Sequence, residues 1–301
     1  MISSLNSANS LFLSQLNAIQ DRMIKAQNQI TSGKRINQAS DAPDQISELL
    51  SARANLDSTH QINQNLVNVK TEVDSAEAAL GQASTAIQQA QVLGTQGANA
   101  TQTAETRSAL ADQVGTILEQ VVGISRTTVE GRYIFAGDSD QTAPYSIDLT
   151  QSNPISGYQG ASVSRQVQHP NGTTFTVAQT ALQIFDSPDA SNNVFSSLVA
   201  LRSALQANDQ TGISSALNTL GTSKTYFERQ LAFYGNAQNK VSDATSYGQS
   251  AELDLTTQIS QIQDADISSA ILELTQAQTA QKAALQAKSS MPTTSLFDFL
   301  K

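Results

Sequence analysis

Apolar residues recur in alternating steps of four and three along one 29-residue stretch, and this spacing constrains the fold more than any other feature. The row consists of Ile62, Leu66, Val69, Val73, Ala76, Leu80, Ala83, Ile87 and Ala90. Such steps place every member on one face of an α-helix. Because a helix rises 1.5 Å per residue, the row alone spans about 43 Å. The sequence therefore predicts a rod-like helix that packs along one narrow seam.

Rows with the same spacing precede and follow this stretch. The first row is Phe12, Leu16, Ile19, Met23, Ala26 and Ile30, and the row after the long helix is Leu110, Val114, Ile117, Val121 and Ile124. Gly33 is a plausible C-cap of the first helix. In the segment that follows, Asp41 is expected to cap the next helix, with Pro43 in its first turn. Gly94 and Gly97 close the long helix, and the next one returns antiparallel to it.

Helical spacing resumes near Asn193 and continues almost to the C-terminus. Its members are Phe195, Leu198, Leu201, Leu205, Leu217, Leu220, Phe227, Leu231, Tyr234 and Val241. A last helix, capped by Asp264 or Asp266, carries Ile267, Ile271, Leu274, Ala277, Ala284 and Leu285. Segments from the two ends of the chain must therefore pair with each other.

The middle of the chain has a different period. Four of the six prolines lie there, at positions 144, 154, 170 and 188. Asn171-Gly172 favours a two-residue hairpin turn with positive φ at both centres, between apolar residues spaced by two. We expect a small β-rich insertion at this point.

The stretch GRYIFAGDSDQTAPY, residues 131–145, concentrates aromatic residues around two aspartates in a chain with only 5% aromatic residues. If Asp138 began a calcium loop, its sixth and twelfth positions would be Gly and Glu, but they are Ala143 and Leu149. The metal-site hypothesis therefore fails. Tyr133, Ile134 and Phe135 instead predict a short strand that enters a turn.

Composition excludes several classes of function. A net charge of −9 and a pI near 4.6 argue against nucleic-acid binding, and the absence of Cys excludes disulfides and thiolate metal sites. We expect no cleaved signal peptide, membrane span, cofactor, metal site or catalytic group. His60 and His169 have no companions at metal-ligand spacing. The basic pair Lys34 and Arg35 is either favourable charge at a helix end or a subunit contact.

The terminal helices have apolar stripes, but their polar faces are mostly uncharged Gln, Asn, Ser and Thr. With few ion pairs along them, they should be marginal in isolation. One hypothesis is that the paired terminal helices leave apolar surface exposed until neighbouring subunits cover it. The helices would then become ordered as the subunits assemble. The alternative is an ordinary two-helix end packed on its own rod.

Two motifs at opposite ends resemble the bacterial flagellin superfamily. SGKRINQASDAPDQ, residues 32–45, is similar to the superfamily's connection between terminal helix and rod. DADISSAILELTQAQTAQKAALQ, residues 264–286, is similar to its C-terminal helix. The likeness covers about the first 135 and the last 100 residues. GRYIFAG at 131–137 and SLFDFL at 295–300 resemble the superfamily's hook-filament junction family more than flagellin.

This resemblance implies a structural role outside the cell, in the flagellum. Its members form a ring between hook-associated protein 1 and flagellin, and they leave through the flagellar type III apparatus without cleavage. They also bind a cytosolic export chaperone through the C-terminal region, for which the candidates here are Leu296, Phe297, Phe299 and Leu300. A short flagellin is the main alternative, and a chemoreceptor-like signalling coiled coil is a more distant one.

The predicted fold is mainly α, a long antiparallel coiled-coil-like rod built from both chain ends with a small β-rich insertion in the middle. Residues 1–40 with 265–301 would form an inner polymerisation domain, 41–135 with 193–264 the rod, and 136–192 the outer insertion. The residues expected to pack subunits together are Leu16, Ile19, Met23, Ile30, Ile267, Ile271, Leu274 and Leu285.

Overall fold

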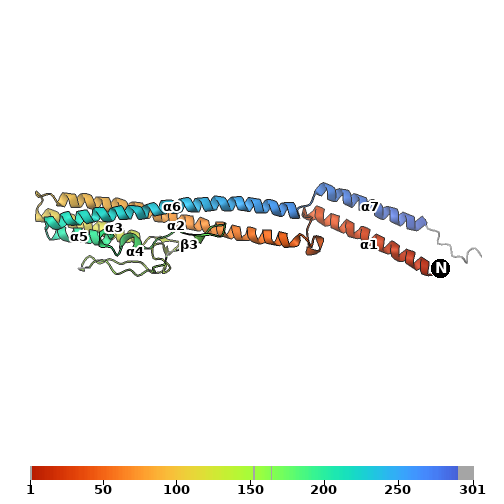
Figure 1. The fold of residues 1–301 in the computed structure, drawn as a ribbon, viewed down its shortest axis with the longest axis horizontal. Helices are drawn as coiled ribbons and strands as arrows, with labels where there is room; N and C mark the ends of the chain where they lie inside the picture. Colours follow the sequence, from red (N-terminus) through yellow and green to blue (C-terminus); the bar gives the residue numbers. More distant parts are fainter. Residues whose placement is uncertain (1, 152, 164, 291–301) are drawn as a thin grey trace, which may run out of the picture. The chain divides into compact units, whose positions relative to one another are not determined.

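The computed structural model describes residues 2–151, 153–163 and 165–290. Its α-helices are α1 (Ile2–Ser32), α2 (Ile46–Gly97), α3 (Ala104–Ser125), α4 (Ala181–Phe185), α5 (Val194–Gln206), α6 (Gln210–Gln263) and α7 (Ile267–Ser290) (Figure 1). The strands are β1 (Thr128–Val129), β2 (Arg132–Tyr133), β3 (Gln166–Gln168) and β4 (Thr174–Thr176). Two short 3₁₀ turns, η1 and η2, cover Ala39–Asp41 and Ala190–Asn192. The expectation of a mainly helical fold with a small β region is confirmed.

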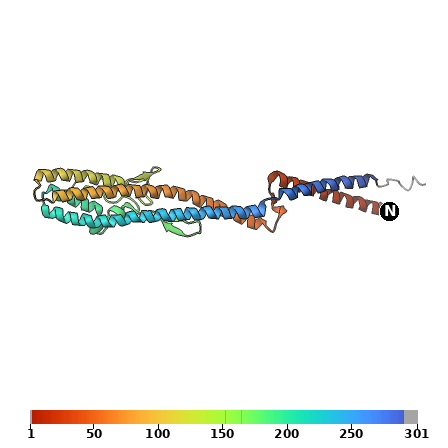
Figure 2. The ribbon, with the colours of Figure 1, turned by 90° about the horizontal axis from the view of Figure 1, so that it is seen from above.

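The chain divides into two compact units. The terminal unit combines the N-terminal residues up to Ser58 with those from Glu252 onward, and the central unit is Thr59–Ala251. In the terminal unit α1 and α7 lie side by side (Figures 1 and 2). In the central unit α3 packs against α5, and the rows predicted along α2, α3, α5 and α6 join one apolar core.

Several helix ends follow the expected chemistry. Gly33 has φ of +70° and its amide donates to the carbonyl of Gln29 at 2.9 Å, which terminates α1. The side chain of Asn193 accepts a hydrogen bond from the amide of Ser196 at the start of α5. At the start of α7 the cap is Asp266, whose carboxylate accepts from the amide of Ser269 at 3.1 Å.

Asp41 does not cap α2, so that expectation is wrong. Its carboxylate lies in η1 and accepts hydrogen bonds from the amides of Asn37 and Gln38 at 2.9 and 3.0 Å. α2 begins only at Ile46, whose amide donates to the carbonyl of Ala42. A short polar side chain satisfies whichever amides lie nearest, and here these belong to the preceding loop.

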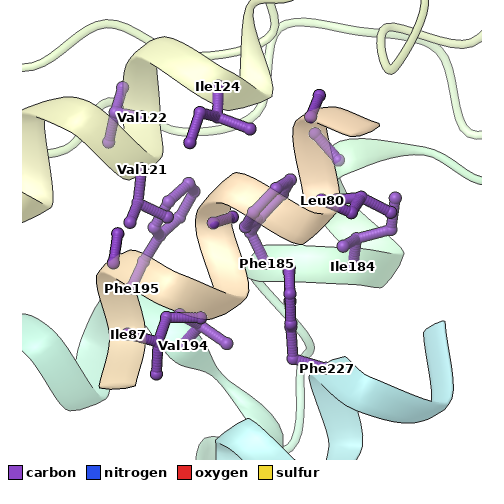
Figure 3. Packing of buried hydrophobic residues seen from close by; sticks show 14 of the residues in the cluster. Leu80, Ile87, Val121, Val122, Ile124, Ile184, Phe185, Val194, Phe195 and Phe227 are labelled. Atoms are coloured by element: carbon purple, nitrogen blue, oxygen red, sulfur yellow. The ribbon is translucent and has the colours of Figure 1, made fainter. Parts of the chain in front are cut away.

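The core of the central unit is aromatic at the place where the middle segment meets the helices. Phe185 of α4 stacks on Phe195 of α5 with ring centroids 5.4 Å apart, and it contacts Phe227 of α6 at the same distance. Figure 3 shows these rings among Leu80 and Ile87 of α2 and the valines of α3. The middle segment is therefore continuous with the helical core, because its apolar side chains belong to the same cluster.

The stretch after α3 forms a tight hairpin. Glu130 and Gly131 have φ of +52° and +77° between the paired residues Val129 and Arg132, which is the backbone of a two-residue turn with positive φ at both centres. The predicted strand is shorter than expected and ends at Tyr133. Phe135 is fully buried, and its ring meets those of Phe185 and Tyr234 edge to face. The aromatic residues of this motif therefore serve packing.

The predicted hairpin around Asn171-Gly172 is present, but its turn differs from the expectation. β3 and β4 pair from Gln166 with Thr176 to Gln168 with Thr174, and the amide of Gly172 donates to the carbonyl of His169 at 2.9 Å. Gly172 has φ of +90°, whereas Asn171 is not among the described residues with positive φ. The loop is longer than two residues, so a single glycine makes the left-handed step.

Candidate functional site

The terminal helices meet along a seam of small residues. Ala26 of α1 and Ala270 and Ala277 of α7 are buried. Larger side chains beside them are half-buried, namely Phe12, Leu16, Ile19, Met23, Ile30 and Leu274. Because alanine occupies the centre of the contact, two helices can approach closely while covering little apolar surface. The pair therefore leaves much of its larger apolar side chains in contact with solvent.

Exposed apolar side chains gather on this terminal unit. Among the described residues, nine large ones are exposed there, Leu11, Leu13, Ile24, Leu50, Leu253, Ile267, Ile271, Leu272 and Leu285. The described part of the larger central unit exposes four, Val67, Val92, Val163 and Tyr247. Scattered exposed apolar residues are normal on any protein, but such a concentration on one small unit is typical of a surface that a partner covers.

Four of the predicted packing residues form one stripe along α7. At 100° per residue, Ile267, Ile271, Leu274 and Leu285 fall within an arc of about 60° on the helix surface. This arc lies beside the alanines that face α1, so we name these four residues the α7 stripe. Leu274 is half-buried, whereas Ile267, Ile271 and Leu285 are 39%, 50% and 50% exposed. Within one chain, α1 therefore covers only the edge of the stripe.

Polar contacts fix the register of α1 against α7. The guanidinium of Arg22 donates to the carboxylate of Glu273 at 2.6 Å. Nearer the chain ends, the ammonium of Lys288 donates to the amide oxygen of Asn9 at 2.5 Å and lies 5.5 Å from the ring centroid of Phe12. These contacts set the register of the two helices without adding buried apolar area, and the exposed ion pair stabilises the seam little.

The connection between α1 and α2 is bound to the end of α6 by Arg35. The backbone amide of Arg35 donates to the carbonyl of Gln263 at 2.6 Å. Its guanidinium donates to the carbonyl of Ile262 and to the side chain of Gln45, each at 2.5 Å. Arg35 is thus satisfied within the chain, which favours an internal structural role over a subunit contact for this residue.

Apolar and charged groups stabilise the same connection. Ile36, Ala42 and Leu49 form a small buried cluster with Ile46, Ile259 and Ile262 packed against it. Desolvation raises the pKa of Asp41, but the hydrogen bonds from Asn37 and Gln38 and the charge of Lys25 outweigh it, so the pKa lies below its ordinary value. The motif at residues 32–45 is therefore a folded corner.

The described part of the chain offers no cluster of metal ligands. It contains no group of three or more His, Asp or Glu residues that could hold a metal ion. The ring of His169 lies against those of Phe175 and Tyr247, which indicates packing. No described helix is long and apolar enough to cross a membrane. The chaperone candidates Leu296, Phe297, Phe299 and Leu300 lie outside the described residues.

Two features of this site are predicted by the sequence, namely the spacing of the α7 stripe and the motif at 32–45. Two other features are not, namely the alanine seam and the ion pair of Arg22 with Glu273. The alanine seam was visible only as part of the same stripe, because periodicity does not show which of two adjacent faces meets α1. Arg22 and Glu273 carried no local signal, since they lie 251 residues apart.

Known proteins match both the sequence and the fold. The family model "Bacterial flagellin N-terminal helical region" matches residues 2–140. "Flagellar hook-associated protein 3" from Escherichia coli (strain K12) is 28% identical, and the match covers 94% of each chain. A flagellin from Clostridium tyrobutyricum is 25% identical over 56% of this chain and 46% of its own. The crystal structure of FlgL from Xanthomonas campestris, at 18% identity, has a TM-score of 0.60 over 69% of this chain and 99% of that one.

Proposed function

We propose that this chain, which is similar to flagellar hook-associated protein 3 over nearly its whole length, joins the hook to the flagellin filament. The match to the Escherichia coli protein of that name extends over nearly all of both chains, which supports this role. The flagellin match covers less than half of the flagellin. A short flagellin remains the second candidate, since it would share the same terminal helices.

The observation that carries the proposal is the exposed α7 stripe beside the alanine seam. Burying a Leu or Ile side chain completely stabilises a complex by about 1.5–3 kcal/mol. Since Ile267, Ile271 and Leu285 are already partly covered, each would contribute less than this on assembly. Summed over the copies of a ring, these contributions hold an inner layer together, with Leu16, Ile19, Met23 and Ile30 completing the packed surface from α1.

In this proposal the ring lies between hook-associated protein 1 and the first flagellin layer, at the outer surface of the bacterium. The chain would reach that position through the flagellar export apparatus without losing its N-terminus. A cytosolic chaperone would hold the C-terminal region before export, through Leu296, Phe297, Phe299 and Leu300. The work of the protein would then be assembly, with no catalytic step.

The experiment is electron microscopy of the full-length protein added to purified hooks that carry hook-associated protein 1. A short cap at the hook tip, from which added flagellin then extends, is the expected result. Long filaments grown by the protein alone under salting-out conditions would favour the flagellin alternative. Absence of both would contradict a flagellar assembly role.

Two substitutions in the α7 stripe test the mechanism. Ile271→Asp and Leu274→Asp should abolish cap formation, because each places a charge in the surface that neighbours cover. The matched control is Gln276→Asp, which adds the same charge to an exposed polar residue about 140–180° around the helix from the stripe. All three variants should remain helical by circular dichroism. Normal caps from Ile271→Asp would contradict the proposed packing.

A further inference from the structure

A pocket of about 360 Å³ in the terminal unit has two basic groups in a mostly polar lining. Lys34 and Arg53 supply the charges, and Ile36 and Leu49 are the buried apolar residues among its lining. The lining contains no Asp or Glu, although the whole chain has a net charge of −9. This pocket is therefore a local basic site on an acidic protein.

The two basic side chains have no charge or hydrogen-bond partner among the described residues. The ammonium of Lys34 and the half-buried guanidinium of Arg53 form no hydrogen bond or ion pair with any other described residue. Arg35 differs, because three hydrogen bonds occupy it. A half-buried guanidinium without a partner has lost part of its hydration, so a carboxylate entering the pocket would be favoured.

One segment in the C-terminal part of the terminal unit is acidic. Residues 252–273 contain five acidic residues and no Lys or Arg. Four of them have partners within the chain, namely Glu252, Asp264, Asp266 and Glu273. Asp254 is exposed and has none among the described residues, and its neighbour Leu253 is 68% exposed. Asp254 is thus the acid of this segment that has no partner among the described residues, and the pocket supplies two basic groups without one.

Asp254 and Arg53 lie at a similar height on the antiparallel segments of α6 and α2. The side chain of Gln258 donates to that of Glu48 at 3.2 Å, which sets the register of the two segments. Arg53 lies five residues after Glu48 and Leu253 five residues before Gln258, so both are about 7.5 Å along the helices from this bond. Within the described chain, however, no ion pair joins Arg53 to Asp254.

We propose that the pocket of Lys34 and Arg53 receives Asp254 of a second copy of this chain. One side of each copy then meets a different side of the next, which is the heterologous contact that generates rings. Opposite charges at this contact set which faces meet and exclude other arrangements, since the remaining acidic surfaces repel one another. This inference rests on the proposed self-association into a ring.

Exchanging the charges of Arg53 and Asp254 tests the contact directly. The full-length chain is titrated onto hooks that carry hook-associated protein 1, and the concentration that caps half of them is measured. Arg53→Glu and Asp254→Arg should each raise this concentration about tenfold or more, because like charges then face each other. The variant with both substitutions should return to within about threefold of the wild type. Arg126→Glu, an exposed reversal in the central unit, should leave it unchanged.

The chain contains no Cys, which permits a second test. Chains with Arg53→Cys and chains with Asp254→Cys are mixed on hooks with a short thiol crosslinker. Crosslinked dimers should form in the mixture and be absent from either variant alone. Their absence from capped hooks would overturn the contact even if the charge variants proved difficult to fold.

The outcomes separate this inference from the proposed function. If the wild type caps hooks but Arg53→Glu caps them equally well, or the double exchange fails to rescue, the Arg53 to Asp254 contact is overturned and the junction role stands. A change in the melting temperature of the isolated chain that the double exchange reverses would show an ion pair within one chain, which also overturns it. If the wild type does not cap hooks, both fail.

Discussion

Arg22 and Glu273 form an ion pair across 251 residues of sequence, with 2.6 Å between the guanidinium Nε and the carboxylate Oε1. The pair joins α1 to α7 and so connects the two ends of the chain within the terminal unit. Both side chains remain partly exposed, so solvent screens the attraction. The contact selects the register of the two helices more than it stabilises them.

This ion pair predicts a pH dependence for the terminal unit. The hydrogen bond from Arg22 holds the pKa of Glu273 below its ordinary value, with the charge of Arg22 acting in the same direction against desolvation. Since the folded-state pKa is depressed, its contribution is present above about pH 4.3 and is lost as the pH falls through the depressed pKa. The protection factors of the α1 amides, measured by hydrogen exchange, should therefore fall more between pH 6 and 3 in the wild type than in Glu273→Gln. Parallel curves would contradict a role for the pair.

Two glycines in GRYIFAG separate the cost of a left-handed backbone from the cost of a steric collision. Gly131 and Gly137 have φ of +77° and +64°. A Cβ on Gly131 would meet nothing within 4 Å, but one on Gly137 would collide with the carbonyl oxygens of Ala161 and Val163. Gly131→Ala should cost about 1–2 kcal/mol from the left-handed backbone alone. Gly137→Ala should cost at least about 1 kcal/mol more in urea unfolding. Equal costs would show that the loop at 161–163 yields freely.

Tyr234 predicts a loss of stability at high pH. Burial raises its pKa, although the hydrogen bond with the backbone of Gln179 opposes this. Because the folded-state pKa lies above the unfolded value of about 10, stability is fully present below pH 10 and falls above it, by up to about 1.4 kcal/mol per pH unit. Denaturant unfolding of Tyr234→Phe between pH 9 and 11 should show a smaller slope than the wild type. A slope unchanged by this substitution would assign the effect to other tyrosines, such as Tyr145, whose pKa burial also raises.

Phe135 tests the packing role of the aromatic motif. Its buried ring contacts Phe185 and Tyr234, which come from α4 and α6. Phe135→Ala should therefore destabilise the central unit by about 3–5 kcal/mol, through lost burial and the cavity that remains. The matched control is Val163→Ala, an exposed apolar residue of the same region, which should change stability by less than about 0.5 kcal/mol. Similar melting temperatures for the two variants would show that Phe135 is not part of the core.

The conformation of single turn residues could not be predicted reliably from the sequence. Asn171-Gly172 predicted its hairpin correctly but not the turn, since the local motif does not determine the length of the loop that closes β3 and β4. The hairpin at Glu130-Gly131 went unpredicted because Glu is an uncommon residue at positive φ. Asp41 was assigned to the wrong helix, since a carboxylate that can cap α2 can equally bind the amides of its own loop.

Heptad spacing by itself determined that the chain is mainly helical, which rows are apolar and where the middle segment interrupts them, because these properties are local and periodic. Only the tertiary structure decided which of two adjacent faces of α7 meets α1, and that the alanines take this contact while Ile271 remains exposed. It also decided that Arg35 is bound internally whereas Arg53 is not. The physical reason is that burial and charge pairing at these positions depend on residues more than two hundred positions away, which the local sequence pattern cannot identify.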